Sequence, residues 1–86
     1  MKLKYRMAIQ HVGSKWFAVA LGEDAKKCNV MIHLNETGSR IMELLQEERT
    51  EEELEQAILA DYEGDEQLIR GSVRAFVEQL SKEGLL

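Results

Sequence analysis

The hydrophobic pattern of this 86-residue chain changes its period at Asn35. Before Asn35, apolar side chains alternate with their neighbours, which is typical of strands that bury one face. After Asn35, apolar side chains recur every three or four residues, which is typical of amphipathic helices. A chain that makes this change once places its strands first and its helices afterwards. The sequence therefore predicts an α+β fold in which a sheet is followed by helices.

Three short strands are expected before Asn35. The first begins near Met7 and ends at a tight turn that contains Gly13. Residues 16–21 form the second strand and residues 29–34 form the third, and the polar residues 22–27 between them are expected to be a loop. Neighbouring short strands usually pair, so we expect a three-stranded antiparallel meander with the third strand at its edge.

The third strand has features of an unprotected edge. Its alternation puts Val30, Ile32 and Leu34 on one face, and Met31 and His33 on the other. Edge strands are normally protected by lysine, proline, a bulge or a covering element, and this strand contains no proline or lysine. Its unpaired backbone groups could accept an added peptide strand. The alternative is an edge covered by a helix or by a second copy of the protein, and the residues alone favour neither.

Three helices are expected after the strands. Asn35 is a suitable N-cap for the first helix, and Thr50 with Glu53 forms a capping box at the start of the second. Asp65 caps the third helix, and Gly84 follows its end. The apolar positions expected to pack these helices onto the core are Ile41, Leu44, Leu45, Leu54, Ala57, Ile58, Tyr62, Leu68, Ile69, Val73, Phe76, Val77 and Leu80.

Size and charge narrow the classes of function. A chain of this length makes one domain with a modest core, and it has no room for a deep substrate cavity. Its formal charge of −5 and its pI near 5.0 argue against a nucleic-acid binder, which normally carries a basic surface. No apolar segment is long enough to span a bilayer, and the N-terminal residues lack the apolar core of a signal peptide. We expect a cytoplasmic protein with no membrane and no nucleic-acid partner.

Catalytic and metal-binding residues are sparse. His11 and His33 lie on predicted strands without an evident nucleophile beside them. Cys28 is the single cysteine, so it forms no internal disulfide, and we expect it to be a small buried apolar residue. A metal site would need all three side chains to converge from separate segments without any short ligand spacing. We therefore expect a protein that is not an enzyme and that holds no metal or cofactor.

The helices from Thr50 to Leu80 also fit a second class of protein. Two helices joined by a short turn resemble a helix-turn-helix, and the strands could form a small wing. The third helix supplies Arg70, Arg74 and Lys82 for phosphate contacts, but acidic residues share the same helix. The alternative function is therefore a small winged-helix regulator that binds DNA or another protein.

Three segments of the chain resemble one protein family. They are L-N-E-T-G-S-R-I-M-E-L-L at 34–45, T-E-E-E-L at 50–54 and V-R-A-F-V-E-Q-L-S-K-E-G-L-L at 73–86. Their order and spacing are similar to those of the PqqD family, the small RiPP recognition elements that serve the modification of ribosomal peptides. The resemblance covers essentially the whole chain and is strongest from Val30 onward. It implies three antiparallel strands followed by three helices, similar to a winged helix-turn-helix.

The resemblance also implies a function. Members of the family are not catalysts; they hold the leader segment of a precursor peptide as an added strand, between the third strand and the third helix. They deliver that peptide to a modifying enzyme, often a radical SAM protein. For this chain the resemblance implies that residues 1–86 are a single peptide-binding domain without a cofactor, and it favours a leader peptide at the open edge. A homodimer formed through the same edge strand is the alternative.

The resemblance assigns a set of contact residues by position. Arg70 and Arg74 lie one helical turn apart and are expected to meet acidic residues of the leader. Val73 and Val77 lie on the apolar stripe, so core packing is the alternative role for both. The full set expected to contact the peptide is Val30, Met31, Ile32, His33 and Leu34 on the strand, with Ile69, Arg70, Val73, Arg74 and Val77 on the helix.

Overall fold

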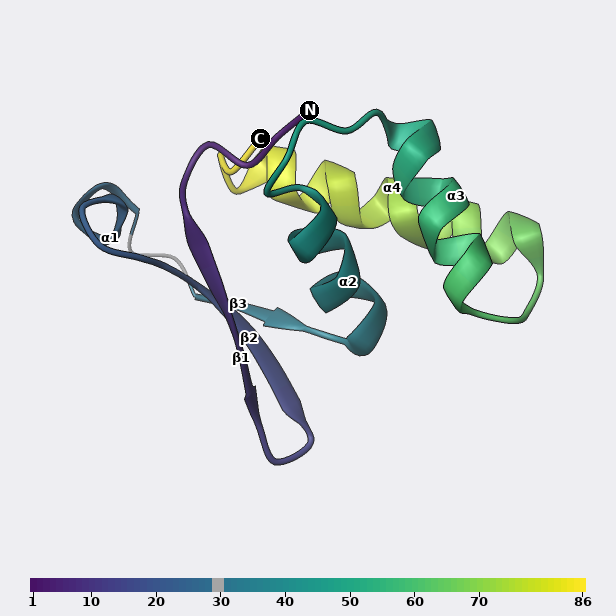
Figure 1. Ribbon diagram of the computed structural model, residues 1–86, viewed down its shortest axis with the longest axis horizontal. Coiled ribbons are helices and arrows are strands. Elements are labelled where there is room, and N and C mark those ends of the chain that lie inside the picture. Colours follow the sequence, from purple (N-terminus) through teal and green to yellow (C-terminus); the bar gives the residue numbers. More distant parts are fainter. Residues whose placement is uncertain (29–30) are drawn as a thin grey trace.

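The computed structural model describes residues 1–28 and 31–86, and apart from the short helix α1 between β2 and β3 its elements follow the expected order of strands and then helices (Figure 1). The strands are β1 (Met7–Val12), β2 (Lys15–Ala20) and β3 (Met31–Leu34). The helices are α1 (Asp24–Lys27), α2 (Glu36–Leu44), α3 (Glu51–Asp61) and α4 (Glu66–Lys82). Of the three long helices, α2 packs on the sheet, whereas α3 and α4 pack on α2 and on each other. The predicted α+β class is confirmed.

The sheet is the expected antiparallel meander in the order β1-β2-β3. Ala18 at its centre pairs with both Ile9 on β1 and Ile32 on β3. Gly13 makes the turn between β1 and β2 with φ +62, a conformation that glycine adopts without strain. Strand β3 is therefore at the edge of the sheet, as predicted. Residues 29 and 30, which were expected to begin this strand, lie outside the described residues.

The expected loop at residues 22–27 contains a short helix instead. Helix α1 occupies Asp24–Lys27, and the Asp24 amide donates to the Leu21 carbonyl at 3.0 Å. An Asp24 carboxylate oxygen accepts the Arg6 amide hydrogen at 2.8 Å, which ties the turn to the start of β1. An acidic first residue and two terminal lysines suit the dipole of a helical turn. Four residues are too few for hydrophobic periodicity to show, so the pattern did not predict this helix.

The core lies between one face of the sheet and the inner faces of the helices. Ala18 and Ile32 are both buried, and they contribute the sheet side of this core. The two ends of the chain meet over it, because the Lys4 amide donates to the Leu85 carbonyl at 2.8 Å. The buried apolar residues are Leu3, Met7, Ala18, Cys28, Ile32, Ile41, Met42, Leu45, Leu54, Ile58, Val73, Val77, Leu80 and Leu85.

The three predicted helix caps are confirmed. The Asn35 side-chain oxygen accepts the Gly38 amide hydrogen at 2.6 Å at the start of α2. Thr50 and Glu53 form the reciprocal capping box, with bonds of 2.8 and 3.1 Å. The Asp65 carboxylate accepts backbone hydrogens in the first turn of α4. Each cap satisfies amides that a helix leaves without a partner, so each fixes where its helix begins.

Leu68 departs from the predicted core. It is 72% exposed, although it was expected to lie on the buried stripe of the third helix. Val73, five positions later, is fully buried, and five residues correspond to about 140° of rotation around a helix. The two side chains therefore lie on different faces of α4, and the expectation for Leu68 was wrong.

Two helical glycines should respond oppositely to alanine. A Cβ atom on Gly38 would lie 3.1 Å from the capping oxygen of Asn35 and 3.2 Å from the Phe76 ring, whereas one on Gly71 would meet nothing within 4 Å. We expect Gly71→Ala to raise the free energy of unfolding by about 0.5–1 kcal/mol. We expect Gly38→Ala to lower it by about 1 kcal/mol, because overpacking outweighs the gain in helix propensity. Urea unfolding followed by circular dichroism measures both; equal gains would contradict the close packing.

Candidate functional site

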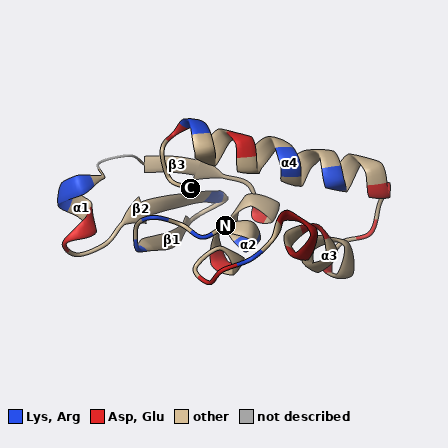
Figure 2. Cartoon of the chain, turned by 90° about the horizontal axis from the view of Figure 1, so that it is seen from above, with Lys and Arg blue, Asp and Glu red and all other residues tan. Residues whose placement is uncertain are grey.

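The outer edge of β3 is open. Among the described residues, the backbone groups of residues 31–34 make no hydrogen bond to any helix or loop. Within the same part of the chain, no Cα atom of β3 lies within 8 Å of a Cα atom of α4. Figure 2 shows β3 as the strand on the side of the sheet along which α4 runs. An extended peptide therefore has free backbone groups along β3 to pair with.

The side chains of β3 divide as the alternation predicted. Met31 is 57% exposed and His33 is also exposed, so both point away from the core. Ile32 is 4% exposed and packs in the core, and Leu34 is partly buried. Val30, the fifth strand residue expected to contact a peptide, lies outside the described residues. The exposed part of this strand is therefore its backbone and two of its side chains.

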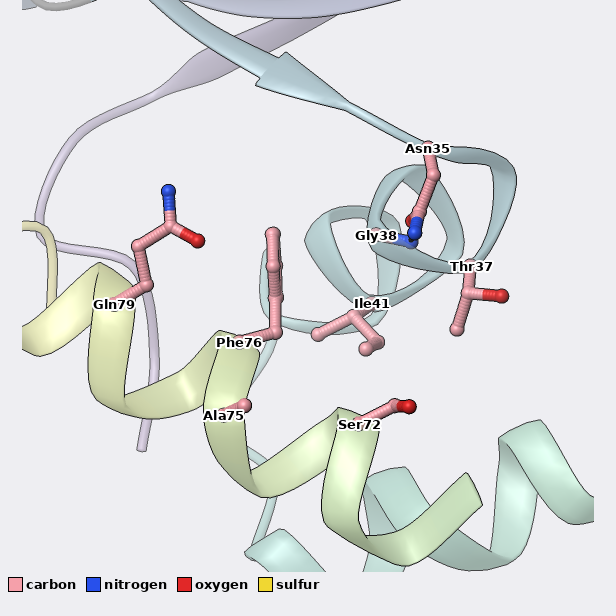
Figure 3. Close-up of a pocket in the computed structure, with 8 residues that line it drawn as sticks. All are labelled: Asn35, Thr37, Gly38, Ile41, Ser72, Ala75, Phe76 and Gln79. Atoms are coloured by element: carbon pink, nitrogen blue, oxygen red, sulfur yellow. Dashed lines mark hydrogen bonds between the residues drawn. The ribbon is translucent and has the colours of Figure 1, made fainter. Parts of the chain in front are cut away.

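A cavity of about 320 Å³ opens where β3 passes into α2, facing the middle of α4 (Figure 3). The Phe76 ring points from α4 toward Gly38 and Ile41, with Asn35 above them (Figure 3). The cavity, called the junction cavity from here on, is lined by Asn35, Thr37, Gly38, Ile41, Ser72, Ala75, Phe76 and Gln79. It is apolar at its floor and carries hydroxyl and amide groups at its rim.

The local sequence explains why the junction cavity forms at this place. The Asn35 cap fixes the first turn of α2 directly after β3. Gly38 has no side chain, so the Phe76 ring approaches the backbone of that turn closely. Ser72 and Ala75 precede Phe76 on α4 and also line the cavity, and their small side chains leave its space unfilled. The cavity is thus bounded by a glycine, an aromatic ring and two small residues.

The α4 residues predicted to contact a peptide lie on three sides of that helix. Val73 and Val77 are buried in the core, and Ile69 is partly buried beside it. Arg70 and Arg74 lie about 160–200° around the helix from Ser72, and therefore on the face away from the junction cavity. These positions do not test the predicted contacts, which stay predictions. The α4 side chains that line the junction cavity are Ser72, Ala75, Phe76 and Gln79.

Arg70 is engaged within the chain. Its guanidinium lies 3.2 Å from carboxylate oxygens of both Glu52 and Glu55 on α3, and 3.0 Å from Glu66 on α4. The hydrogen bonds that Arg70 donates to Glu66 and Glu55 raise the pKa of Arg70 above its ordinary value. Glu55 is 6% exposed, so this carboxylate depends on Arg70 for its compensation. Arg70 therefore joins α3 to α4.

The remaining chemically reactive side chains do not come together. The His11 ring stacks on Trp16 with 3.8 Å between centroids, and the His33 ring meets Phe17 edge-on at 5.1 Å. Cys28 is buried, as expected for a small apolar residue. In residues 1–28 and 31–86, no three His, Cys, Asp or Glu side chains are grouped as metal ligands would be. No helix of this part of the chain is long and apolar enough to cross a membrane.

Comparison with known proteins identifies the family. The model of the family described as "Coenzyme PQQ synthesis protein D (PqqD)" matches residues 11–86. The chain belongs to the PqqD family. A solved structure described as "TbiB1 in Complex with the TbiA(beta) Leader Peptide" has the same fold, with a TM-score of 0.72 and 28% sequence identity. That match covers 100% of this chain and 94% of the other. No curated protein matches the chain.

Several residues that line the junction cavity were not singled out in the sequence as peptide contacts. Asn35 and Gly38 belong to the segment that carries the PqqD resemblance, but it was interpreted only as a helix start. Ser72, Ala75 and Gln79 lie beside the apolar stripe of α4, and a stripe does not show which of its two flanks faces a groove. Phe76 was expected in the core, and it packs against the core while also lining the cavity.

The lowered pKa values of two carboxylates on α3 should make the stability of the fold depend on pH. The pKa of Glu52 is lowered, chiefly by a hydrogen bond from Gln56 and then by Arg70, and backbone bonding at Thr50 lowers the pKa of Glu53. A lowered carboxylate pKa stabilises the fold above the unfolded pKa, and this stabilisation disappears as pH falls through the folded pKa. We expect the free energy of unfolding to decrease from about pH 5 to pH 3.

The variant Arg70→Met should be less stable than the wild type at pH 7, because it leaves the buried Glu55 carboxylate unpaired. The difference should shrink at low pH, because the attraction between Arg70 and Glu52, which lowers the pKa of Glu52, is lost as Glu52 takes up a proton. Arg74→Met is the matched control, since Arg74 makes no ion pair among the described residues. Urea unfolding at each pH measures these differences. If both variants lower the free energy of unfolding equally at pH 7, the ion pairs of Arg70 do not join α3 to α4.

Proposed function

We propose that this protein is a non-catalytic module that binds the leader segment of a ribosomally made precursor peptide and presents it to a modifying enzyme. The observation that carries the proposal is the open backbone edge of β3 beside the junction cavity. Membership in the PqqD family supports it, as does the similarity to a protein solved with a leader peptide. The leader would pair with β3 as a fourth strand.

An added strand would continue the pleat of β3. Main-chain hydrogen bonds along residues 31–34 supply affinity, and alternate side chains supply specificity. Peptide side chains on the same face as Ile32 and Leu34 turn toward the helices, where the junction cavity lies. Those on the other face lie beside Met31 and His33. The apolar floor of the cavity favours an apolar peptide side chain, held by the Phe76 ring and Ile41.

This arrangement gives different roles to the residues predicted by position. Met31, Ile32, His33 and Leu34 act through their backbone, and Val73 and Val77 support α4 from the core side. Arg70 holds α3 against α4. The proposed peptide-facing residues of α4 are Ser72, Ala75, Phe76 and Gln79.

The proposed partner is a modifying enzyme, and the proposed compartment is the cytoplasm. Residues 1–86 would act as a single binding domain without a cofactor, and the modifying enzyme would be of the radical SAM class. Binding both peptide and enzyme raises the effective concentration of one near the other. The cytoplasm is where a ribosomally made precursor is available. A second copy of this chain pairing through β3 would compete with the leader for the same edge.

The distribution of charge favours a peptide over DNA as the partner. Residues 31–86 carry five Lys and Arg against fourteen Asp and Glu, a formal charge of −9. The recognition helix of a winged-helix regulator would correspond to α4, which lies in this acidic part. The carboxylates that surround Arg70 also occupy one of its few cations. Phosphate contacts would meet repulsion there, so the winged-helix alternative lacks electrostatic support.

Titration of a ¹⁵N-labelled sample tests the binding mode. The probes are synthetic leader segments from short precursor genes beside this gene. Each is also made in two forms that are N-methylated at alternate residues, so that only one form loses the backbone donors that face β3. We expect amide shifts in residues 31–34 and 72–79, and at least tenfold weaker binding of the methylated peptide that lacks donors toward β3. Shifts confined to other segments, or equal binding of both methylation patterns and the parent, would contradict strand addition.

A charge added to α4 on the cavity side should block the peptide. We expect Ala75→Glu to weaken binding of a leader about tenfold or more, because it places a carboxylate over the apolar floor of the junction cavity. Ser81→Glu adds the same charge to an exposed position on the opposite side of α4 and should leave binding unchanged. Fluorescence anisotropy measures both affinities. If the two variants bind alike, the peptide does not lie along this face of α4.

A further inference from the structure

A second cavity lies next to the junction cavity, at the turn between α3 and α4. Its volume is about 320 Å³, and it shares Thr37 and Ser72 with the junction cavity. Gly64, with φ +143, makes the turn at its rim. This turn cavity is lined by Thr37, Ile58, Tyr62, Glu63, Gly64, Asp65, Leu68, Ile69 and Ser72. Since the two cavities share residues, one extended chain can pass over both.

The turn cavity has an apolar floor and an exposed apolar wall. Ile58 is buried at its base, and Tyr62 and Ile69 are partly buried around it. Leu68 forms part of the lining while remaining 72% exposed. It is the most exposed of the large apolar side chains among the described residues. An apolar group placed in this cavity would cover Leu68 and remove its surface from water.

The surroundings of the turn cavity are acidic. Glu63 and Asp65 line it, and the charges of Glu36 and Asp61 act on the neighbouring Tyr62. Two of the arginines on these helices, Arg40 and Arg70, are already engaged with carboxylates. Arg40 lies 2.9 Å from Asp61 and 3.3 Å from Glu43, and Arg70 binds its three carboxylates. The rim therefore keeps an excess of negative charge that an incoming cation would neutralise.

We propose that the turn cavity is a second anchor site for the same peptide, which takes an apolar side chain flanked by lysine or arginine. This inference rests on the proposed function, and it adds a binding determinant outside the segment that pairs with β3. Continuity with the junction cavity and complementary charge select a basic segment of the peptide as the occupant.

The geometry of α4 sets the spacing of the two anchors. Leu68 and Ile69 line the turn cavity, and Ala75 and Phe76 line the junction cavity, seven positions farther along the helix. Seven residues of helix span about 10 Å. An extended peptide covers that distance in about three residues. The basic anchor should therefore lie about three residues from the side chain held in the junction cavity.

Selection from an mRNA-display library of random 20-residue peptides on the wild-type protein tests the inference. Enriched peptides should carry an apolar residue beside lysine or arginine, about three residues from a second apolar residue. One enriched peptide is then measured by fluorescence anisotropy against four variants. Leu68→Ser should weaken it about tenfold, and Glu63→Lys should weaken it more at low salt than at high salt. The matched controls Leu21→Ser and Glu83→Lys, at exposed positions outside both cavities, should leave the affinity unchanged.

The outcomes separate this inference from the proposed function. Peptides that perturb the amides of residues 31–34 but bind Leu68→Ser and Glu63→Lys like the wild type overturn the second anchor alone. The second anchor is also overturned if the enriched peptides show no preference for lysine or arginine. It is overturned as well if Leu21→Ser weakens binding as much as Leu68→Ser does. A selection that yields no peptide, or only peptides that leave residues 31–34 unperturbed, overturns both proposals. The four variants alter exposed residues, and circular dichroism confirms that each one folds.

Discussion

The contact between the Phe76 ring and the backbone at Gly38 is the constraint on which the other features depend. In the described part of the chain, no Cα atom of α3 or α4 lies within 8 Å of a Cα atom of the sheet, so α2 is the long helix that lies closest to it. The ring meets α2 within its first turn, directly after β3 ends. One contact thus fixes α4 relative to the open edge, and it does so without α4 covering that edge.

Both cavities lie where α2 meets α4, and they share Thr37 and Ser72. Arg70 then fixes α3 against the far side of α4, where Glu55 is buried. On the side of α4 that lines the cavities, Ser72 and Ala75 are small and Leu68 is exposed. The proposed peptide site lies on this side of α4, and membership in the PqqD family supports that proposal.

Most of the fold could be predicted from the sequence, because local signals decide it. The change of period at Asn35, the capping box at Thr50 and the alternation along β3 each depend on residues close in the chain. The site was less predictable. The rotation of α4 about its own axis decides whether Arg70 faces α3 or a peptide, and whether Leu68 is buried. Contacts between distant segments determine that rotation, and a single apolar stripe does not reveal them. Helix α1 was not predicted, because a helix of a single turn is too short to show a repeating pattern of apolar residues.

The uneven distribution of charge has a consequence for how the molecule meets its partners. Residues 1–28 carry six Lys and Arg against two Asp and Glu, a formal charge of +4, whereas residues 31–86 carry −9. The sheet end and the helix end thus form the two poles of an electric dipole (Figure 2). In the electric field of a charged partner the molecule is oriented before contact, because a negatively charged surface attracts the positive pole made by the strands. Orientation at encounter is then set within about a Debye length, and raising the ionic strength removes this guidance while leaving the cavities unchanged.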